Sequence, residues 1–359
     1  MEVLDNVNKF FERFQNVPVT EKIFFVQHLR VMIRAGVSLS SALNVLSAQS
    51  SNKRFKSVLT DIKNGVEKGN AFSDSIKKHT NIFGNLFVSM IKAGEMGGKL
   101  EEVLNQLFVQ MKKDHEIQSK VRGAMIYPAV VLFAMVGIGI LMMVFVVPKL
   151  AEVFAESATT LPLPTRILMA SSGFIVNNGI LLIIVAIFAV GGFIFTIKTP
   201  KGKYYFDYFL LKIPIIGKII KKINLARFSR TLSSLLKTDI SITKTLNITS
   251  EILGNEIYKK VTLEAADKVT KGISIAKTLK EETSIFPPVV TEIITVGEET
   301  GSLDDVLDEM AGFYEEEIDQ TMKNLPSIIE PVLILFLGVG VALMALAVIM
   351  PMYSLTDAI

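Results

Sequence analysis

The sequence predicts an all-α membrane protein with two homologous cytoplasmic helical bundles, of about six helices each, and three transmembrane helices. Three observations predict this class: three long runs without charge, a duplicated segment, and hydrophobic residues at helical spacing. Half of the 359 residues are hydrophobic and 20% are charged, while the net charge is only +3. The charges must therefore be segregated from the apolar runs, and the net charge gives no case for binding nucleic acid.

The uncharged runs predict the transmembrane helices. They cover residues 124–148, 167–197 and 331–356. A helix needs about 20 apolar residues to cross the hydrocarbon core of a bilayer, and each run exceeds this length. Core helices of soluble proteins are rarely so long and so free of charge. We therefore interpret all three runs as membrane spans.

Lysine residues beside the runs predict the orientation in the membrane. Four bases precede the first run, and seven lysines follow the second: Lys198, Lys201, Lys203, Lys212, Lys218, Lys221 and Lys222. Residues 149–166 carry two bases and two acids. Because a lysine excess marks the cytoplasmic side, we expect the N-terminus in the cytoplasm and the C-terminus outside. For the seven lysines, contact with anionic membrane lipid is preferred over a partner site.

These boundaries divide the chain into alternating soluble and membrane segments of a multi-pass membrane protein. The predicted segments are an N-terminal segment (1–19), a first helical domain (20–122), a span (124–148), an external loop (149–166), a span (167–197), a linker with a second helical domain (198–330), and a span (331–356).

A duplication supports this order. Residues 25–148 align without a gap with residues 228–351, and about a quarter of the aligned positions are identical. Each copy contains a soluble domain and the span that follows it. The middle span has no counterpart, because both copies begin in the cytoplasm and end outside, so a return span must separate them. The repeat and the charge distribution lead independently to the same topology.

The soluble part of each copy is predicted to be helical. In the first copy, hydrophobic stripes are interrupted at residues typical of helix ends: Gly36, Asn52, Gly69, Asn81 and the pair Gly97-Gly98. Ser38 is placed to cap a helix. After Gly98, hydrophobic residues at i, i+3, i+4 and i+7 from Leu100 predict a long amphipathic helix, and the second copy repeats this pattern from Leu303.

One motif occurs once in each copy, in the form G-E-x-x-G-x-L-acid-acid-V-L. Its candidate structural or interaction residues are Gly94, Glu95 and Gly98 in the first copy, and Gly297, Glu298 and Gly301 in the second. We interpret the motif as a tight turn between helices, which Gly98 and Gly301 permit. The acids that follow suit the first turn of the next helix, whose dipole favours negative charge there.

The sequence contains no motif that indicates a catalytic site, a nucleotide-binding site or a metal site. Gly98-Lys99 superficially resembles a phosphate-binding loop, but that motif needs a glycine at Ala93 and a serine or threonine at Leu100. Adjacent acids such as Glu101-Glu102 diverge by about 100° on a helix and make a poor chelate. The three histidines are scattered, and the chain has no cysteine. We predict no cofactor, no metal and no enzymatic activity.

Pro128 and the pair Glu330-Pro331 stand at the entries of the first and third spans and are further candidates. Proline suits the first turn of a helix, and a glutamate before it would complement the positive helix end. Alternatively, Glu330 is a charge at membrane depth that contacts a partner. The first copy has Tyr127 at the position of Glu330. Both interpretations remain open at this stage.

Over residues 20–355 the duplicated unit, the repeated turn, the proline-led spans and the order of segments resemble the type II secretion system F family. These are inner-membrane platform proteins of type IV pili, type II secretion and competence pseudopili. The resemblance implies two six-helix cytoplasmic bundles, no enzymatic activity and self-association into a homo-oligomer. It also implies three kinds of partner: a hexameric assembly ATPase, pilins or pseudopilins, and other inner-membrane assembly proteins.

The resemblance further implies that the platform couples movement of the ATPase to insertion of pilins. One departure from the family pattern is Thr238-Asp239, where the first copy has Ala35-Gly36. Because aspartate tolerates the left-handed conformation better than most residues, we expect the turn to be kept. The alternative function is a membrane transporter or channel built from repeats. It is disfavoured by the small, odd number of spans and by their charge-free interiors.

Overall fold

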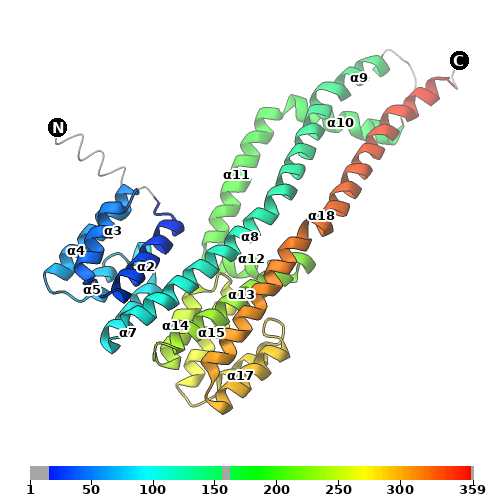
Figure 1. Ribbon diagram of the computed structural model, residues 1–359. Helices are drawn as coiled ribbons and strands as arrows, with labels where there is room; N and C mark the ends of the chain where they lie inside the picture. The colour runs from blue at the N-terminus through cyan, green and yellow to red at the C-terminus, as the bar shows by residue number, and fades with distance from the viewer. Residues whose placement is uncertain (1–15, 156–161, 357–359) are drawn as a thin grey trace, which may run out of the picture. The chain divides into compact units, whose positions relative to one another are not determined.

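The computed structural model describes residues 16–155 and 162–356, and every regular element within these ranges is helical (Figure 1). The all-α prediction is thereby confirmed for the described residues. The chain divides into two compact units, Met1–Gln118 with Asp207–Ile318 and Ser119–Phe206 with Asp319–Ile359. Parts of the predicted N-terminal segment (1–15), of the external loop (156–161) and of the C-terminal end (357–359) lie outside the described residues.

In the first unit, most helices of the first repeat begin and end at residues expected from the sequence, but Asn81 lies inside the short helix Thr80–Phe83 rather than at a helix end. Ser38 accepts a hydrogen bond from the Ser41 amide at 3.3 Å, and Asn52 accepts one from the Phe55 amide at 2.9 Å, so both side chains act as N-caps. The helices are α2 (Val19–Arg34), α3 (Leu39–Gln49), α4 (Lys53–Glu67), α5 (Phe72–Lys77), α6 (Thr80–Phe83), α7 (Asn85–Gly97) and α8 (Leu100–Leu141).

The second repeat has the same order of helices. Asp239 adopts φ 58°, where Gly36 has φ 80° in the first repeat, so the turn is kept as expected. The helices are α13 (Pro214–Leu236), α14 (Ile242–Ile252), α15 (Glu256–Val269), α16 (Ile275–Leu279), a 3₁₀ turn (Lys280–Glu282), α17 (Pro288–Thr300) and α18 (Leu303–Thr356). Before them lies α12 (Pro200–Lys212).

Aromatic side chains form the centre of each bundle. In the first repeat, the rings of Phe25 and Phe55 are 5.7 Å apart, and Phe83 lies 5.9 Å from both. Burying one such side chain contributes about 1.5–3 kcal/mol to folding. Three residues of the second repeat, Leu235, Ile240 and Ile248, belong to the same buried cluster. The two repeats therefore share apolar contacts within the first unit.

The second bundle replaces the central Phe55 with Tyr258, which is fully buried. Its ring contacts that of Phe286 at 5.3 Å, and its hydroxyl donates to the Ile285 carbonyl at 2.7 Å. Burial raises the pKa of the Tyr258 phenol far above its ordinary value, so the group stays a neutral donor. The extra oxygen is thus accommodated without leaving a buried polar atom unsatisfied.

A group of ion pairs joins α8, α13 and α18 in the first unit. On α13, Arg230 and Lys237 both bind Asp308 of α18, with the Lys237 ammonium at 2.8 Å. Arg230 also binds Glu315 at 2.9 Å, and Lys113 of α8 lies 3.1 Å from the same carboxylate. Partial burial alone would raise the pKa of Asp308, but Lys237 and Arg230 lower it overall.

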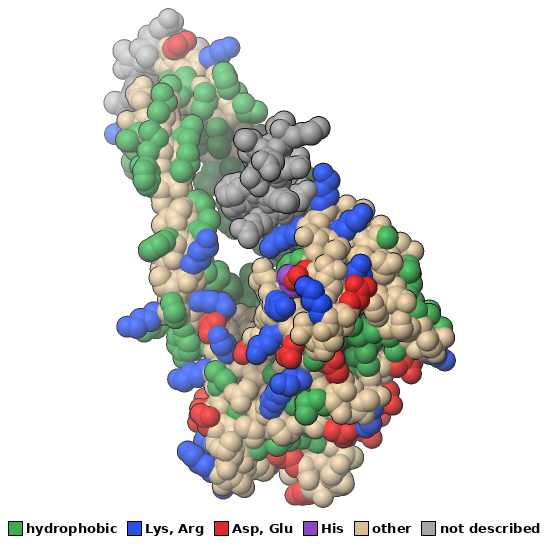
Figure 2. Space-filling model, turned by 90° about the vertical axis from the view of Figure 1, so that its left-hand side faces the viewer, with side chains coloured by type: hydrophobic (Ala, Val, Ile, Leu, Met, Phe, Trp, Pro, Cys, Tyr) green, Lys and Arg blue, Asp and Glu red, His purple; other side chains and the backbone are tan. Residues whose placement is uncertain are grey.

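The second unit contains the apolar parts of helices that are long enough to cross a membrane. Helices of sufficient length and apolarity are Leu100–Glu152, Gly179–Lys198 and Leu303–Met350. In Figure 2, apolar side chains gather along such helices, while charged side chains crowd over the bundles. The second uncharged run is divided at Asn178 between α10 (Leu163–Asn177) and α11 (Gly179–Lys198). Only α11 is long enough by itself.

Between α8 and α9 (Val147–Ala155) the helix contains a π-helical segment, Met142–Val146. The Val147 amide donates to the Met142 carbonyl five residues earlier. The next carbonyl in this pattern, that of Met143, would need the amide of residue 148, which is proline and has no N–H. The Ser172 hydroxyl of α10 donates to the Met143 carbonyl at 2.5 Å instead. An otherwise orphaned backbone group is therefore satisfied by the neighbouring helix.

The expectation that Pro128 and Pro331 open new helices is wrong. Pro128 lies inside α8, and Pro331 lies inside α18, which continues from Leu303 to Thr356. A proline removes one helical hydrogen bond, whereas ending the helix in an apolar environment would expose several unpaired backbone groups. Continuity is therefore favoured, and Glu330 has no helix end to complement.

Candidate functional site

The repeated glutamate of the G-E-x-x-G motif caps another helix of its own bundle. Glu95 lies near the end of α7, and its carboxylate faces the first residues of α5. It accepts hydrogen bonds from the Phe72 amide at 2.6 Å, the Ser73 amide at 2.9 Å and the Ser73 hydroxyl at 2.6 Å. Partial burial would raise the pKa of Glu95, but these three donors lower it overall. The ionised carboxylate thus serves as the N-cap of α5.

The second repeat has the same arrangement with one difference. Glu298 of α17 accepts hydrogen bonds from the amides of Ile275 at 2.6 Å and Ala276 at 3.1 Å, at the start of α16. Ala276 stands where the first repeat has Ser73, so the hydroxyl contact is missing. In compensation, Ser274 caps α16 by accepting from the Lys277 amide at 3.3 Å. The repeated glutamate is a structural residue in both copies.

The motif glycines have two distinct roles in the turn. Gly98 and Gly301 adopt the left-handed conformation, with φ 66° and 70°, and end α7 and α17. Gly94 and Gly297 allow the next helix to approach. A Cβ atom at Gly94 would lie 2.7 Å from the Val103 side chain, and one at Gly297 would lie 2.4 Å from that of Val306. The motif therefore combines a cap, a close approach and a turn.

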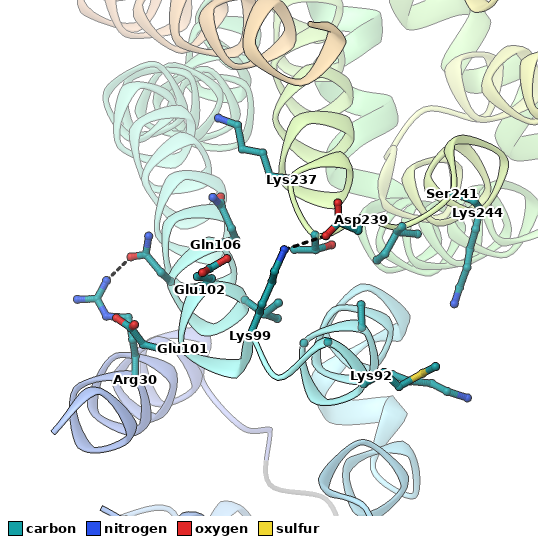
Figure 3. A pocket seen from close by; sticks show the side chains of 18 of the residues that line it. Arg30, Lys92, Lys99, Glu101, Glu102, Gln106, Lys237, Asp239, Ser241 and Lys244 are labelled. Carbon is teal, nitrogen blue, oxygen red and sulfur yellow. Dashed lines mark hydrogen bonds and ion pairs between the residues drawn. The ribbon is translucent and has the colours of Figure 1, made fainter. Parts of the chain in front are cut away.

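A pocket of about 720 Å³ lies within the first unit, beside the turn of the first repeat and the turn around Asp239 (Figure 3). We call it the turn pocket. The Lys99 ammonium meets the Asp239 carboxylate at 2.9 Å, and both side chains are at least half exposed. Figure 3 also shows Lys92 and Lys244 extending away from the other labelled side chains. Among the described residues neither of them has an ion pair.

The turn pocket offers charge and hydrogen-bonding groups rather than reactive ones. Its charged residues are Arg30, Arg34, Lys92, Lys99, Glu101, Glu102, Lys237, Asp239 and Lys244. It contains no histidine or cysteine. No group of three metal-binding side chains occurs within residues 16–155 and 162–356. Exposed pairs such as Lys99–Asp239 are screened by solvent and contribute little to stability. The pocket can therefore form ion pairs and hydrogen bonds.

Comparison with known proteins identifies the fold. The family described as type II secretion system, protein F, matches residues 25–148 and 228–351, which are the two copies of the repeat. The chain belongs to the type II secretion system protein F family. The match extends over the motifs of both turns, so the capping glutamates and the turn glycines lie inside the family segments.

Relatives in the protein F family cover most of the chain. A type IV pilus assembly protein PilC of Thermus thermophilus is 34% identical over 92% of this chain and 81% of its own length. PilC of Myxococcus xanthus is 33% identical over 96% of this chain and 83% of its own length. A type II secretion system protein F of Pseudomonas aeruginosa is 30% identical over 92% and 82%.

The family segments also contain the three candidates outside the turns. Pro128, Glu330 and Pro331 belong to the second unit, inside α8 and α18. The six motif residues lie in the two turns described above, three in each. Pro128, Glu330 and Pro331 lie in neither turn. Glu330 is exposed, and within the described part of the chain no base pairs with it.

Several residues that hold the bundles together by hydrogen bonds or ion pairs were not identified from the sequence. Ser73, whose amide and hydroxyl bind Glu95, lies 22 residues away along the chain. Asp308 forms ion pairs with two bases of α13. At the equivalent position of the first repeat, Asn105 accepts a hydrogen bond from Arg30. The sequence could have indicated Asn105 and Asp308, because both are polar residues at equivalent positions of the two repeats.

Proposed function

We propose that this protein is a non-enzymatic inner-membrane platform for assembly of a type IV pilus or a type II secretion pseudopilus. The observation that carries the proposal is the coincidence of both family matches with both copies of the repeat. The names of the relatives, type IV pilus assembly protein and type II secretion system protein F, support the same role. The platform couples a cytoplasmic, hexameric assembly ATPase to insertion of pilins or pseudopilins.

The helices support such coupling. α8 and α18 each join one soluble bundle to one apolar segment without a break. A displacement of the bundle would therefore reach the membrane segment along a helix rather than through a loop. Self-association and contacts with other inner-membrane assembly proteins complete the proposed partners.

The function is tested by removing the protein from its cell and measuring surface fibres and secreted protein together. We expect the product that depends on this chain, either surface fibres or secreted protein, to disappear and to return on complementation. In a second assay, the purified chain should change the turnover of its cognate ATPase without hydrolysing nucleotide itself. Unchanged assembly in the deletion strain would contradict the proposal.

The proposed topology places both bundles in the cytoplasm and the C-terminus outside. Since the chain has no cysteine, single cysteines can be placed at will. A cysteine appended after Ile359 should react with a membrane-impermeant maleimide in cells whose cytoplasmic membrane is intact. A cysteine at the exposed Lys271 should react only after that membrane is opened. Protection of the C-terminal cysteine would contradict this orientation.

A further inference from the structure

Helix α12 exposes an aromatic stripe that is bounded by lysine at both ends. Its exposed residues follow the spacing i, i+3, i+4, i+7, i+8 and i+11, which places them on one helical face: Lys201, Tyr204, Tyr205, Tyr208, Phe209 and Lys212. Among its aromatic residues, the largest exposed fractions are 71% for Tyr205 and 62% for Phe209. We call these six residues the aromatic face of α12.

The opposite side of α12 is held by specific contacts, which fix the direction of the aromatic face. Gly202 lies so close to α11 that a Cβ atom there would stand 2.0 Å from the Thr196 carbonyl oxygen. The ring of Phe206 contacts that of Phe193 at 5.7 Å. Asp207 is buried and accepts a hydrogen bond from the Glu256 amide at 2.9 Å. Rotation of the first half of α12 would break the contacts of Gly202 and Phe206 within the second unit, and rotation of its second half would break the contact of Asp207 within the first unit.

The position of α12 along the chain places it at the edge of the bilayer. The apolar helix α11 ends at Lys198, and α12 begins at Pro200 after one extended residue. An extended residue spans at most about 3.6 Å, so the first turn of α12 must lie near the end of the span. Tyrosine and lysine are the side chains that favour this interfacial layer, because each has an apolar body and a polar tip.

We propose that the aromatic face of α12 lies in the headgroup layer of the cytoplasmic leaflet and binds anionic phospholipid. The proposal rests on membrane insertion of α11, which the proposed function includes. The rings enter the boundary between headgroups and acyl chains, and Lys201 and Lys212 bind lipid phosphates. The Lys212 ammonium lies 4.5 Å from the centre of the Tyr208 ring, so charge and ring act at the same place.

The chemistry of the face favours lipid over a protein helix. Three of its four rings are tyrosines, and the hydroxyls of Tyr204, Tyr205 and Tyr208 bind no other described residue. A dry protein interface would leave such hydroxyls unsatisfied at a cost, whereas headgroups and interfacial water satisfy them. Asp207, the only acid in α12, is turned inward, so no negative charge on this helix opposes an anionic surface.

The absence of tryptophan from the chain allows a direct test. Phe209→Trp creates a single fluorophore on the aromatic face of the full-length protein, reconstituted in phosphatidylglycerol vesicles with and without brominated acyl chains. Met96→Trp, at an 80% exposed position in α7, is the matched control for solvent. Phe188→Trp, at a 76% exposed position in α11, reports insertion of the span.

We expect blue-shifted emission and strong bromine quenching for Phe209→Trp, with quenching at least about twofold greater than for Met96→Trp. Quenching should weaken when phosphatidylcholine replaces phosphatidylglycerol, or when Lys201→Gln and Lys212→Gln are combined with Phe209→Trp. Solvent-like emission without quenching would overturn the proposal. So would blue-shifted emission without quenching, since a protein would then cover the face.

Loss of quenching for Phe188→Trp as well would instead indicate failure of membrane insertion and contradict the proposed function. The two failures are therefore distinguishable.

Discussion

Removal of the repeated glutamate is expected to destabilise the two bundles unequally. The N-cap residue of α5, Ala71, has no capping side chain, so Glu95 alone receives the amides of Phe72 and Ser73. Both of these residues are buried. Leaving a buried donor unsatisfied costs about 1–3 kcal/mol, and water can relieve part of this at a helix end. We expect Glu95→Ala to lower the local stability of α5 by about 2–3 kcal/mol.

The corresponding change in the second repeat should cost less. Glu298→Ala removes two hydrogen bonds rather than three, and Ser274 still caps α16. We expect a loss of about 1 kcal/mol. Glu299→Ala is the matched control, because Glu299 is the exposed neighbour of Glu298 on the same helix and has no hydrogen bond or ion pair among the described residues.

Amide hydrogen exchange of the full-length protein in detergent measures these losses. A local loss of 2 kcal/mol should accelerate exchange of the segment 72–77 about 30-fold, and the Glu298 change should accelerate exchange in α16 several-fold. The control should leave both segments unchanged. Equal effects of the Glu95 and Glu298 changes, or an effect of Glu299→Ala as large as theirs, would refute the capping argument.

The same glutamate predicts a pH dependence. The pKa of Glu95 is lowered below its ordinary value of 4.5, so its ionised form stabilises the folded state. This contribution is fully present above pH 4.5 and is lost as the pH falls through the lowered pKa. Protection of α5 should therefore decrease under acid in the native chain, and Glu95→Gln should remove that part of the dependence.

Three further predictions concern the turns and the third span. Gly98→Ala or Gly301→Ala should each cost about 1 kcal/mol, because φ is positive there, and should lower protein abundance in membranes; full abundance with lost assembly would instead make these glycines contact residues. The purified chain should hydrolyse no nucleotide, and Lys99→Ala should not change this; hydrolysis that disappears in the variant would contradict our interpretation of the turn. Glu330→Gln should keep normal abundance, because no helix end requires the charge. It should reduce fibre assembly or secretion, because the contact between Glu330 and a partner would lose its charge; normal assembly would exclude such a contact.

The local parts of the fold could be predicted from the sequence, and the long-range contacts could not. The cap at Ser38 and the turn at Gly98 depend on neighbouring residues, so residue type and spacing were sufficient. The role of Glu95 depends on backbone amides 22 and 23 residues away, and amides leave no sequence signature. Pro128 was misinterpreted because local preference favours a helix start, while the apolar surroundings favour an unbroken helix.

The aromatic face of α12 is an intermediate case. Its spacing could have been read from residues 201–212 alone. What the sequence could not provide is the inward direction of Asp207, which depends on the amide of Glu256. The residues of the face can therefore be found in the sequence, but the partner of Asp207 required the structure.

The composition of the first bundle's buried cluster has a consequence for biogenesis. Apart from Leu235, Ile240 and Ile248, its members lie between Phe25 and Leu107. Ribosomes add about 5–20 residues per second, so the stretch from Leu107 to the end of the first uncharged run takes at least about 2 seconds. Helical domains with local contacts fold within milliseconds. The first repeat can therefore fold before its span is released from the ribosome, and the second repeat is synthesised in the presence of a folded surface onto which those three residues pack.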